Sequence, residues 1–200
     1  MKEEITKVAL ERFMQYDIRS MTIKKLVEPL GISTKTVYKY FKSKEELLEE
    51  CLRLMYRQFS DDLELLLKSN ENPAVTLLTL FRSSLAKDFG INHGFFYDLN
   101  HYYPELQNVA LAREQNNFAK KILPIVENGV VEGYFKNDTN PAIALTGIGV
   151  LYASITRSGS YDQFGVSANV LFKNLVEVYI RGMCTEKGIK EIEINPQHNK

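Results

Sequence analysis

Residues 31–47, GISTKTVYKYFKSKEEL, combine a turn, a short basic helix and the start of a longer helix. Gly31 supplies the turn, and Ser33 is expected to cap a helix over Thr34–Phe41. Before the turn, Thr22 is expected to cap another short helix. Two short helices joined by a glycine turn, the second of them basic, predict a helix-turn-helix.

Beyond this motif, apolar residues recur at steps of three and four along almost the whole chain, which predicts an all-α protein. Ser43 and Glu46 have the spacing of a capping box that starts a long helix. We expect an N-terminal three-helix domain over residues 1–46, a helical body over 47–186 and a flexible tail over 187–200. The expected helices are, in order, 3–15, 23–30, 34–41, 44–70, 74–89, 95–101, 104–131, 141–156 and 166–184.

The composition of the 200-residue chain excludes several classes of protein. Lys and Arg balance Asp and Glu at 25 each, so a uniformly basic coat is excluded, and two cysteines are too few for a disulfide scaffold. The first residues lack the apolar region of a secretory signal. The uncharged stretch 139–156 contains too many polar and small residues to predict a membrane span. We therefore expect a cytoplasmic protein without a membrane segment.

The balanced total charge hides a basic segment. Residues 19–44 contain seven Lys and Arg residues and one glutamate, a local charge of +6, which favours an anionic partner. The second helix of the motif can enter the major groove of DNA with its N-terminal residues against base edges, and the polar groups around it can reach phosphates. On spacing alone, a plain three-helix bundle with surface lysines and two buried tyrosines is an equal alternative. The candidate DNA-contacting residues are Thr22, Lys24, Ser33, Thr34, Lys35, Thr36, Tyr38, Lys39, Tyr40 and Lys44.

Residues 21–47 resemble the N-terminal domain of TetR-type (TetR/AcrR) transcriptional regulators. The shared pattern is Gly, aliphatic, Ser, a few variable residues, aliphatic, Tyr, two variable residues, Phe, one variable residue, Ser, Lys, Glu, one variable residue and Leu. The resemblance implies a homodimeric regulator, usually a repressor, that binds double-stranded DNA at a palindromic operator and is released by a small molecule. It also implies that Ser33, Lys35 and Thr36 face bases, and that Phe41 anchors the domain core. The phosphate-holding residues that it implies are Thr22, Tyr38, Tyr40 and Lys44.

Three positions depart from the family pattern. Leu26-Val27 replaces the usual Ile-Ala, and Asp17-Ile18 stands where a glycine usually follows the first helix. Pro29 lies within the second helix. Because proline lacks an N–H and disfavours helix at the preceding residue, this helix is expected to end early or kink.

The rest of the chain resembles the family only in outline, as a helical regulatory body. Aromatic residues crowd positions 81–103, where they can line an apolar pocket or fill the core. The helices at 141–157 and 166–184 have apolar faces that fit a four-helix dimer interface or an intramolecular core. We favour the dimer, because a two-fold regulator needs a two-fold contact. An apolar or aromatic ligand is expected, and the residues that tune it, by resemblance, are Met55, Phe59, Phe81, Tyr102, Phe118 and Tyr152.

The sequence shows no pattern typical of catalysis. It contains no phosphate-binding loop, nucleophile elbow or paired-carboxylate cluster, and its three histidines lack metal-ligand spacing. We therefore expect no enzyme, cofactor or metal. Cys51 and Cys184 are interpreted as buried small hydrophobic residues. Two alternatives remain: a helical small-molecule-binding protein or enzyme without a DNA role, and a protein-interaction adaptor that uses the aromatic residues.

Overall fold

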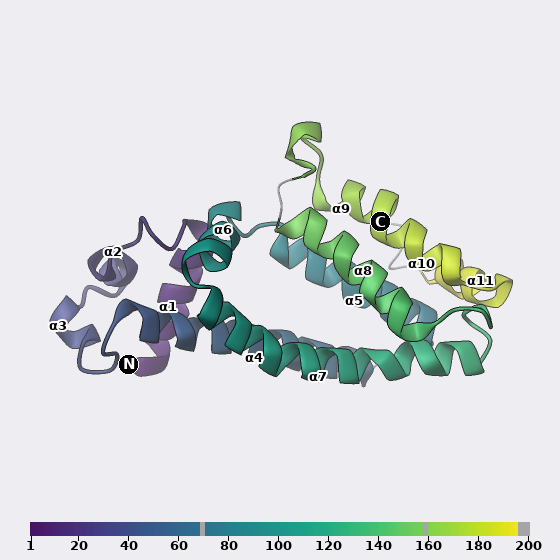
Figure 1. Cartoon of the computed structure of the whole chain (residues 1–200), viewed down its shortest axis with the longest axis horizontal. Helices are drawn as coiled ribbons and strands as arrows, with labels where there is room; N and C mark the ends of the chain where they lie inside the picture. Colours follow the sequence, from purple (N-terminus) through teal and green to yellow (C-terminus); the bar gives the residue numbers. More distant parts are fainter. Residues whose placement is uncertain (69–70, 158–159, 196–200) are drawn as a thin grey trace. The chain divides into compact units, whose positions relative to one another are not determined.

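The computed structural model describes residues 1–68, 71–157 and 160–195, and within one helix it does not describe the side chains of Gln107 and residues 110–119. The described residues are almost entirely helical, which confirms the all-α class (Figure 1). They form two compact units. Unit 1 comprises Met1–Asp61 and Gly90–Gln115, and unit 2 comprises Asp62–Phe89 and Asn116–Lys200.

Unit 1 begins with the three helices of the helix-turn-helix region, followed by three further helices. The three N-terminal helices are α1 (Lys2–Gln15), α2 (Ile23–Val27) and α3 (Thr34–Val37). The further ones are α4 (Lys44–Leu67), α6 (His93–Tyr102) and α7 (Pro104–Val131). Both α4 and α7 continue into unit 2.

The caps predicted for the two short helices are confirmed. The hydroxyl of Thr22 accepts a hydrogen bond from the N–H of Lys25 at 3.3 Å, and that of Ser33 accepts one from the N–H of Thr36 at 3.2 Å. Between these helices, Gly31 has φ +62°, a left-handed conformation that glycine adopts at little steric cost. The predicted glycine turn is therefore confirmed as well.

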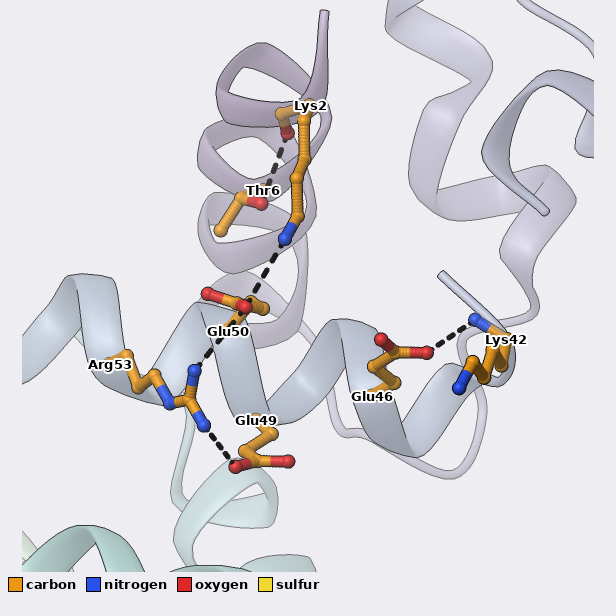
Figure 2. Close-up of polar contacts among 7 residues, drawn as sticks. All are labelled: Lys2, Thr6, Lys42, Glu46, Glu49, Glu50 and Arg53. Atoms are coloured by element: carbon orange, nitrogen blue, oxygen red, sulfur yellow. Dashed lines mark hydrogen bonds and ion pairs between the residues drawn. The ribbon is translucent and has the colours of Figure 1, made fainter. Parts of the chain in front are cut away.

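The start of α4 is capped as predicted, with one difference. The hydroxyl of Ser43 accepts the N–H of Glu46 at 3.2 Å. The carboxylate of Glu46, however, accepts the N–H of Lys42 at 2.5 Å and not that of Ser43 (Figure 2). This bond ties the turn that precedes α4 to the helix itself. The helix ends at Leu67, slightly before the predicted end.

The second helix ends early, as the position of Pro29 predicts. α2 stops at Val27, and a 3-10 turn over Glu28–Leu30 follows it. Proline has no N–H with which to continue the α-helical hydrogen bonds, so the chain tightens at this point. The departure from the family pattern at Pro29 is thus accommodated by a shorter helix.

α3 is also shorter than predicted. It is α-helical only over Thr34–Val37, and residues 38–40 form turns. The N–H groups of Lys39 and Tyr40 bond to carbonyl oxygens three residues earlier, at 3.3 and 2.9 Å, which is the pattern of a 3-10 turn. The chain therefore reaches Phe41 through one α-helical turn followed by a tighter one.

A cluster of buried apolar side chains holds the three N-terminal helices against α4. Ile5, Ala9 and Phe13 of α1 are fully buried in it. Val37 and Phe41 join the cluster, with 0% and 1% of their surface exposed. The predicted role of Phe41 as a core anchor agrees with this burial.

Unit 2 packs its helices around α5. α5 contacts α8, α10 and α11, and Figure 1 shows α5 and α8 running alongside each other. Its core includes the fully buried side chains of Ile148 and Phe172. A π-helical turn over Phe172–Val176 joins α9 to α10. The helices of this unit are α5 (Pro73–Asp88), α8 (Pro141–Thr156), α9 (Ala168–Leu171), α10 (Glu177–Met183) and α11 (Glu186–Ile194).

The prediction of a flexible tail from residue 187 is wrong for its first part, because α11 occupies it through Ile194. The hydroxyl of Thr185 accepts the N–H of Gly188 at 3.3 Å and donates to the carbonyl oxygen of Gly133 at 2.6 Å. Ile192 is fully buried. A side-chain cap and one buried face thus hold a mostly polar helix. Residues 196–200 lie outside the described residues, and the domain boundary at residue 46 stays a prediction.

Candidate DNA interface

The polar side chains of residues 33–40, here called the recognition segment, lie mostly on the surface of unit 1. Ser33, Thr34, Lys35 and Lys39 are exposed, and Thr36 is half-buried. Tyr38 and Tyr40 are 54% and 41% exposed. The alternative with two buried tyrosines therefore does not describe this segment. Val37 and Phe41 are buried in the core at either end of this stretch. The three residues between them, Tyr38, Lys39 and Tyr40, are therefore directed outward.

Two hydroxyls of the recognition segment are already engaged with each other. Ser33 Oγ lies 3.0 Å from Thr36 Oγ1, and it also accepts the N–H of Thr36. The neighbouring Thr34 and Lys35 are exposed. Within the segment, Thr34 and Lys35 are thus freer than the cap pair to meet an outside group.

The basic side chains around this segment are available to an external anion. Lys24, Lys25, Lys35 and Lys39 are exposed, and none of them forms an ion pair with any residue that the structure describes. Thr22 is exposed at the start of α2. Unpaired cations next to exposed hydroxyls and phenols are the groups that hold a phosphate backbone.

Lys44 differs from the other candidate cations, because it is half-buried and already bonded. Its Nζ donates to the carbonyl oxygen of Ile18 at 2.5 Å and lies 5.9 Å from the centre of the Phe13 ring. Burial lowers the pKa of Lys44, while the carboxylates of Glu45 and Asp98 oppose that shift. Since an ammonium group has three N–H donors, two remain for an anion.

Sequence reasoning missed one ion pair between α1 and α4 and two further ion pairs within α4. Lys2 Nζ lies 3.3 Å from Glu50 Oε1, and Arg53 bonds Glu50 at 3.4 Å and Glu49 at 2.6 Å (Figure 2). The ammonium of Lys2 also lies 5.5 Å from the centre of the Phe41 ring. The sequence spacing of Arg53 from Glu49 and Glu50, four and three residues, is typical of ion pairs along a helix. No sequence pattern indicates the long-range ion pair of Lys2 with Glu50.

The residues expected to tune a ligand do not share one described site. Met55 and Phe59 belong to the apolar cluster of unit 1, and Tyr102 is 48% exposed. In unit 2, the rings of Phe81 and Tyr152 meet edge to face with centres 6.1 Å apart. The side chain of Phe118 lies outside the described residues, so its predicted role stays a prediction.

Unit 2 contains a cleft of about 360 Å³ that none of these candidate residues lines. Its walls come from the end of α4, the start of α5 and the end of α7. The lining is largely polar, which differs from the apolar pocket expected from the sequence. The residues that line it are Leu67, Glu71, Asn72, Pro73, Thr76, Ile125, Asn128, Glu132 and Tyr134.

The two helices predicted to form a dimer interface expose aliphatic side chains. On α8, Ile143 and Val150 are 69% and 65% exposed, and on α10 Val178 is 60% exposed. The same helices also bury a face against α5, with Ile148 and Ile180 fully buried. One face of these helices therefore fills the core of unit 2, and the dimer interface stays a prediction.

The two thiols are buried and free. Burial raises the pKa of Cys51 and raises that of Cys184 to about 11. A thiol that stays protonated is a poor nucleophile, which supports their interpretation as small hydrophobic residues. In the described part of the chain, histidine, cysteine and carboxylate side chains nowhere gather in threes that could hold a metal ion.

None of the described helices combines the length and hydrophobicity that crossing a membrane requires.

Comparison with known proteins bears on both units. The family model for bacterial regulatory proteins of the tetR family matches residues 5–51. The HTH-type transcriptional repressor KstR2 of Mycobacterium tuberculosis is 26% identical over 146 residues, which cover 68% of this chain and 69% of that protein. KstR2 of Mycolicibacterium smegmatis is 24% identical over 143 residues, 68% of each chain.

Solved structures share the fold at low identity. The reduced form of NemR from E. coli superposes with a TM-score of 0.76 at 15% identity, covering 92% of this chain and 96% of that one. FadR from Bacillus subtilis, solved with stearoyl-CoA, superposes with a TM-score of 0.73 at 17% identity, covering 92% and 100%. The matched motif lies on the exposed basic segment, and the relatives are transcriptional repressors and not enzymes. The chain thus carries an N-terminal DNA-binding domain of the tetR type, followed by a helical body.

Proposed function

We propose that this protein is a repressor that binds a palindromic operator as a homodimer and is released by a small apolar or aromatic molecule. The observation that carries the DNA part is the recognition segment, whose polar side chains are exposed while its apolar anchors are buried. The name of the KstR2 relatives, transcriptional repressors, supports the sign of regulation. A regulator of this kind works in the cytoplasm, where the DNA is.

On the DNA, the recognition segment enters the major groove. Thr34 and Lys35 are exposed at its N-terminal end, where side chains reach base edges, and Lys35 can donate to a guanine edge. Ser33 and Thr36 stabilise the conformation of this end through the contact between their hydroxyls. We expect both side chains to face bases as well. The phosphate contacts come from Thr22, Lys24, Tyr38, Lys39, Tyr40 and Lys44.

The dimer forms through the helices at 141–157 and 166–184. The exposed aliphatic residues Ile143, Val150 and Val178 support this choice, since they leave an open apolar face on α8 and α10. A two-fold dimer would present two recognition segments to successive major grooves, about 34 Å apart. A palindromic operator is the sequence that matches this symmetry.

The released state requires a ligand, and we expect one with a large apolar part. The stearoyl-CoA in the FadR structure from Bacillus subtilis shows that this fold can hold a fatty acyl group in another protein. In this chain the edge-to-face contact of Phe81 with Tyr152 supports their inclusion in the predicted pocket. Met55, Phe59, Tyr102 and Phe118 complete the set that we expect to tune ligand choice.

Selection from random duplex DNA tests the proposal. The protein should enrich a palindrome and bind it on the order of a thousandfold more tightly than unrelated DNA of equal length. The logarithm of the affinity should fall linearly with the logarithm of salt concentration, by about 0.9 for each phosphate contacted. Failure to enrich any sequence, or affinity that does not change with salt, would contradict a DNA-binding role. Compounds that dissociate the selected complex then identify the effector class.

A further inference from the structure

One peptide group in unit 1 is held between two oppositely charged side chains. The Ile18–Arg19 peptide lies in the loop between α1 and α2. Its carbonyl oxygen accepts from Lys44 Nζ at 2.5 Å, and its N–H donates to Asp98 Oδ2 at 2.7 Å. A lysine from the start of α4 and an aspartate from α6 are thus linked through a single planar group.

The surroundings of this peptide restrict its movement. Asp98 is only 5% exposed. The guanidinium of Arg19 lies 4.1 Å from the centre of the Tyr102 ring, and the carboxylate of Asp17 accepts the N–H of Ser20 at 2.5 Å. The loop is therefore fixed on the α6 side by a buried carboxylate and an aromatic ring.

The charges reinforce each other across the peptide. A carboxylate at the N–H end and an ammonium at the carbonyl end both increase the polarisation of the group, so each hydrogen bond strengthens the other. This arrangement restricts the rotamers of Lys44 in the free protein. The loss of side-chain entropy therefore occurs on folding and not on DNA binding. After the bond to Ile18, the ammonium keeps two further N–H donors.

We propose that Asp98 is a positioning residue for DNA binding, which orients the Lys44 ammonium toward a phosphate through the Ile18–Arg19 peptide. This inference rests on the proposed function, because it needs the Lys44–phosphate contact. Asp98 does not touch DNA itself. Asp98 lies on α6. Its contact with the Ile18–Arg19 peptide therefore also makes DNA affinity depend on the position of α6.

A double-mutant cycle tests the link. Operator affinity is measured for the wild type, Lys44→Ala, Asp98→Ala and the double variant over a range of salt concentrations. Each single variant should lose roughly tenfold in affinity and lower the salt slope by about one. The double variant should bind no more weakly than Lys44→Ala alone, because both changes remove the same contact.

Two controls separate positioning from charge and from folding. Asp98→Asn keeps an oxygen that accepts the Arg19 N–H, and it should stay within about twofold of the wild type. Glu105→Ala removes an exposed carboxylate from the same unit, so it matches the charge change without touching the peptide. If Asp98→Ala does not fold, amide exchange of Arg19 in Lys44→Ala replaces it, and exchange should be faster than in the wild type.

Four results would overturn the inference: losses that multiply in the double variant, an Asp98→Ala variant with unchanged affinity and salt slope, a Lys44→Ala variant that binds normally, or unchanged Arg19 exchange in Lys44→Ala. The failure of the proposed function is a separate observation, since it appears as a wild type that selects no operator. In that case the inference about Asp98 fails together with the proposed function, and the wild type alone shows it.

Discussion

The two units expose different chemistry. In unit 1 the cations near the recognition segment, Lys24, Lys35 and Lys39, point to solvent and form no ion pair with the described residues. In unit 2 several charges are paired internally, as in the contact of Lys121 with Glu64 at 2.7 Å, while aliphatic side chains such as Val150 stay open. Unit 1 thus suits a polyanion, and unit 2 suits an apolar partner.

This contrast indicates which kind of partner each unit can bind. An exposed, unpaired lysine costs little to keep, because water solvates it, and it can exchange that water for phosphate. Exposed aliphatic residues on two adjacent helices gain by burial against a partner, at about 25 cal/mol per Å². Substitutions at exposed or paired groups test whether each unit behaves as this contrast requires.

The largest effect is expected from charges placed on the open apolar face of unit 2. Val150→Glu combined with Val178→Glu should raise the dimer dissociation constant by about 100-fold, because each protomer would bury two carboxylates without partners. Sedimentation velocity over a range of protein concentrations measures this. Val131→Glu is the matched control, since Val131 is 86% exposed on α7, outside the proposed interface. An unchanged dimer in the double variant would place the interface elsewhere.

The second prediction concerns the most enclosed charge cluster of unit 2. Glu177 contacts Arg82 at 3.4 Å and Arg181 at 2.8 Å, and its side chain is 12% exposed. Glu177→Ala should lower the free energy of unfolding by about 2 kcal/mol, less than for a fully buried pair because Arg181 is about a third exposed. Urea denaturation measures this.

Glu193→Ala serves as its control, because Glu193 is 64% exposed and lies 3.8 Å from Arg181. It should change the free energy of unfolding by less than about 0.5 kcal/mol. Equal losses in both variants would mean that burial does not distinguish the two pairs, and the contrast between the units would lose its basis.

The third prediction addresses the open lysines of unit 1. Lys35→Ala should reduce the preference for operator over random DNA by about tenfold, because the lost group reads a base and not only a phosphate. Lys190→Ala removes another exposed lysine, from unit 2, and should leave this ratio unchanged. If Lys35→Ala weakens specific and random binding alike, the side chain contacts phosphate and the assigned base contact is wrong.

The parts of the molecule that sequence predicts well are those set by neighbouring residues. The caps at Thr22 and Ser33, the turn at Gly31 and the early helix end at Pro29 depend on groups at most four residues apart. A short stretch of sequence is therefore enough to predict them. The helix-turn-helix could be predicted for this reason.

The parts that sequence did not predict depend on distant partners. The peptide that joins Lys44 to Asp98 brings together three separate segments, and no periodicity marks such a contact. The tail was misjudged because α11 is held by Thr185 and by the burial of Ile192, and both depend on tertiary packing. The candidate ligand residues share this limitation, since a pocket is assembled from several helices.

The smallest effect is expected at a buried carboxylate in unit 2, Asp88, which accepts the hydroxyl of Tyr152 at 2.6 Å. Burial raises the pKa of Asp88, and the bond from Tyr152 only partly offsets this. A raised folded-state pKa means that the native protein holds the proton more tightly than the unfolded chain. Stability is therefore lost as the pH rises from the ordinary aspartate value of 3.8 through the raised folded pKa.

Asp88→Asn should remove this loss, because the amide is neutral and its oxygen can still accept the Tyr152 hydroxyl. At pH 7 the free energy of unfolding of the variant should be about 1 kcal/mol higher than that of the wild type. This difference should disappear as the pH is lowered toward 4. Urea denaturation at both pH values measures it. Tyr152→Phe is the opposite test, since it leaves the carboxylate without that donor and should enlarge the loss at pH 7. A constant difference between Asp88→Asn and the wild type across this range would show that the charge of Asp88 does not limit the stability of unit 2.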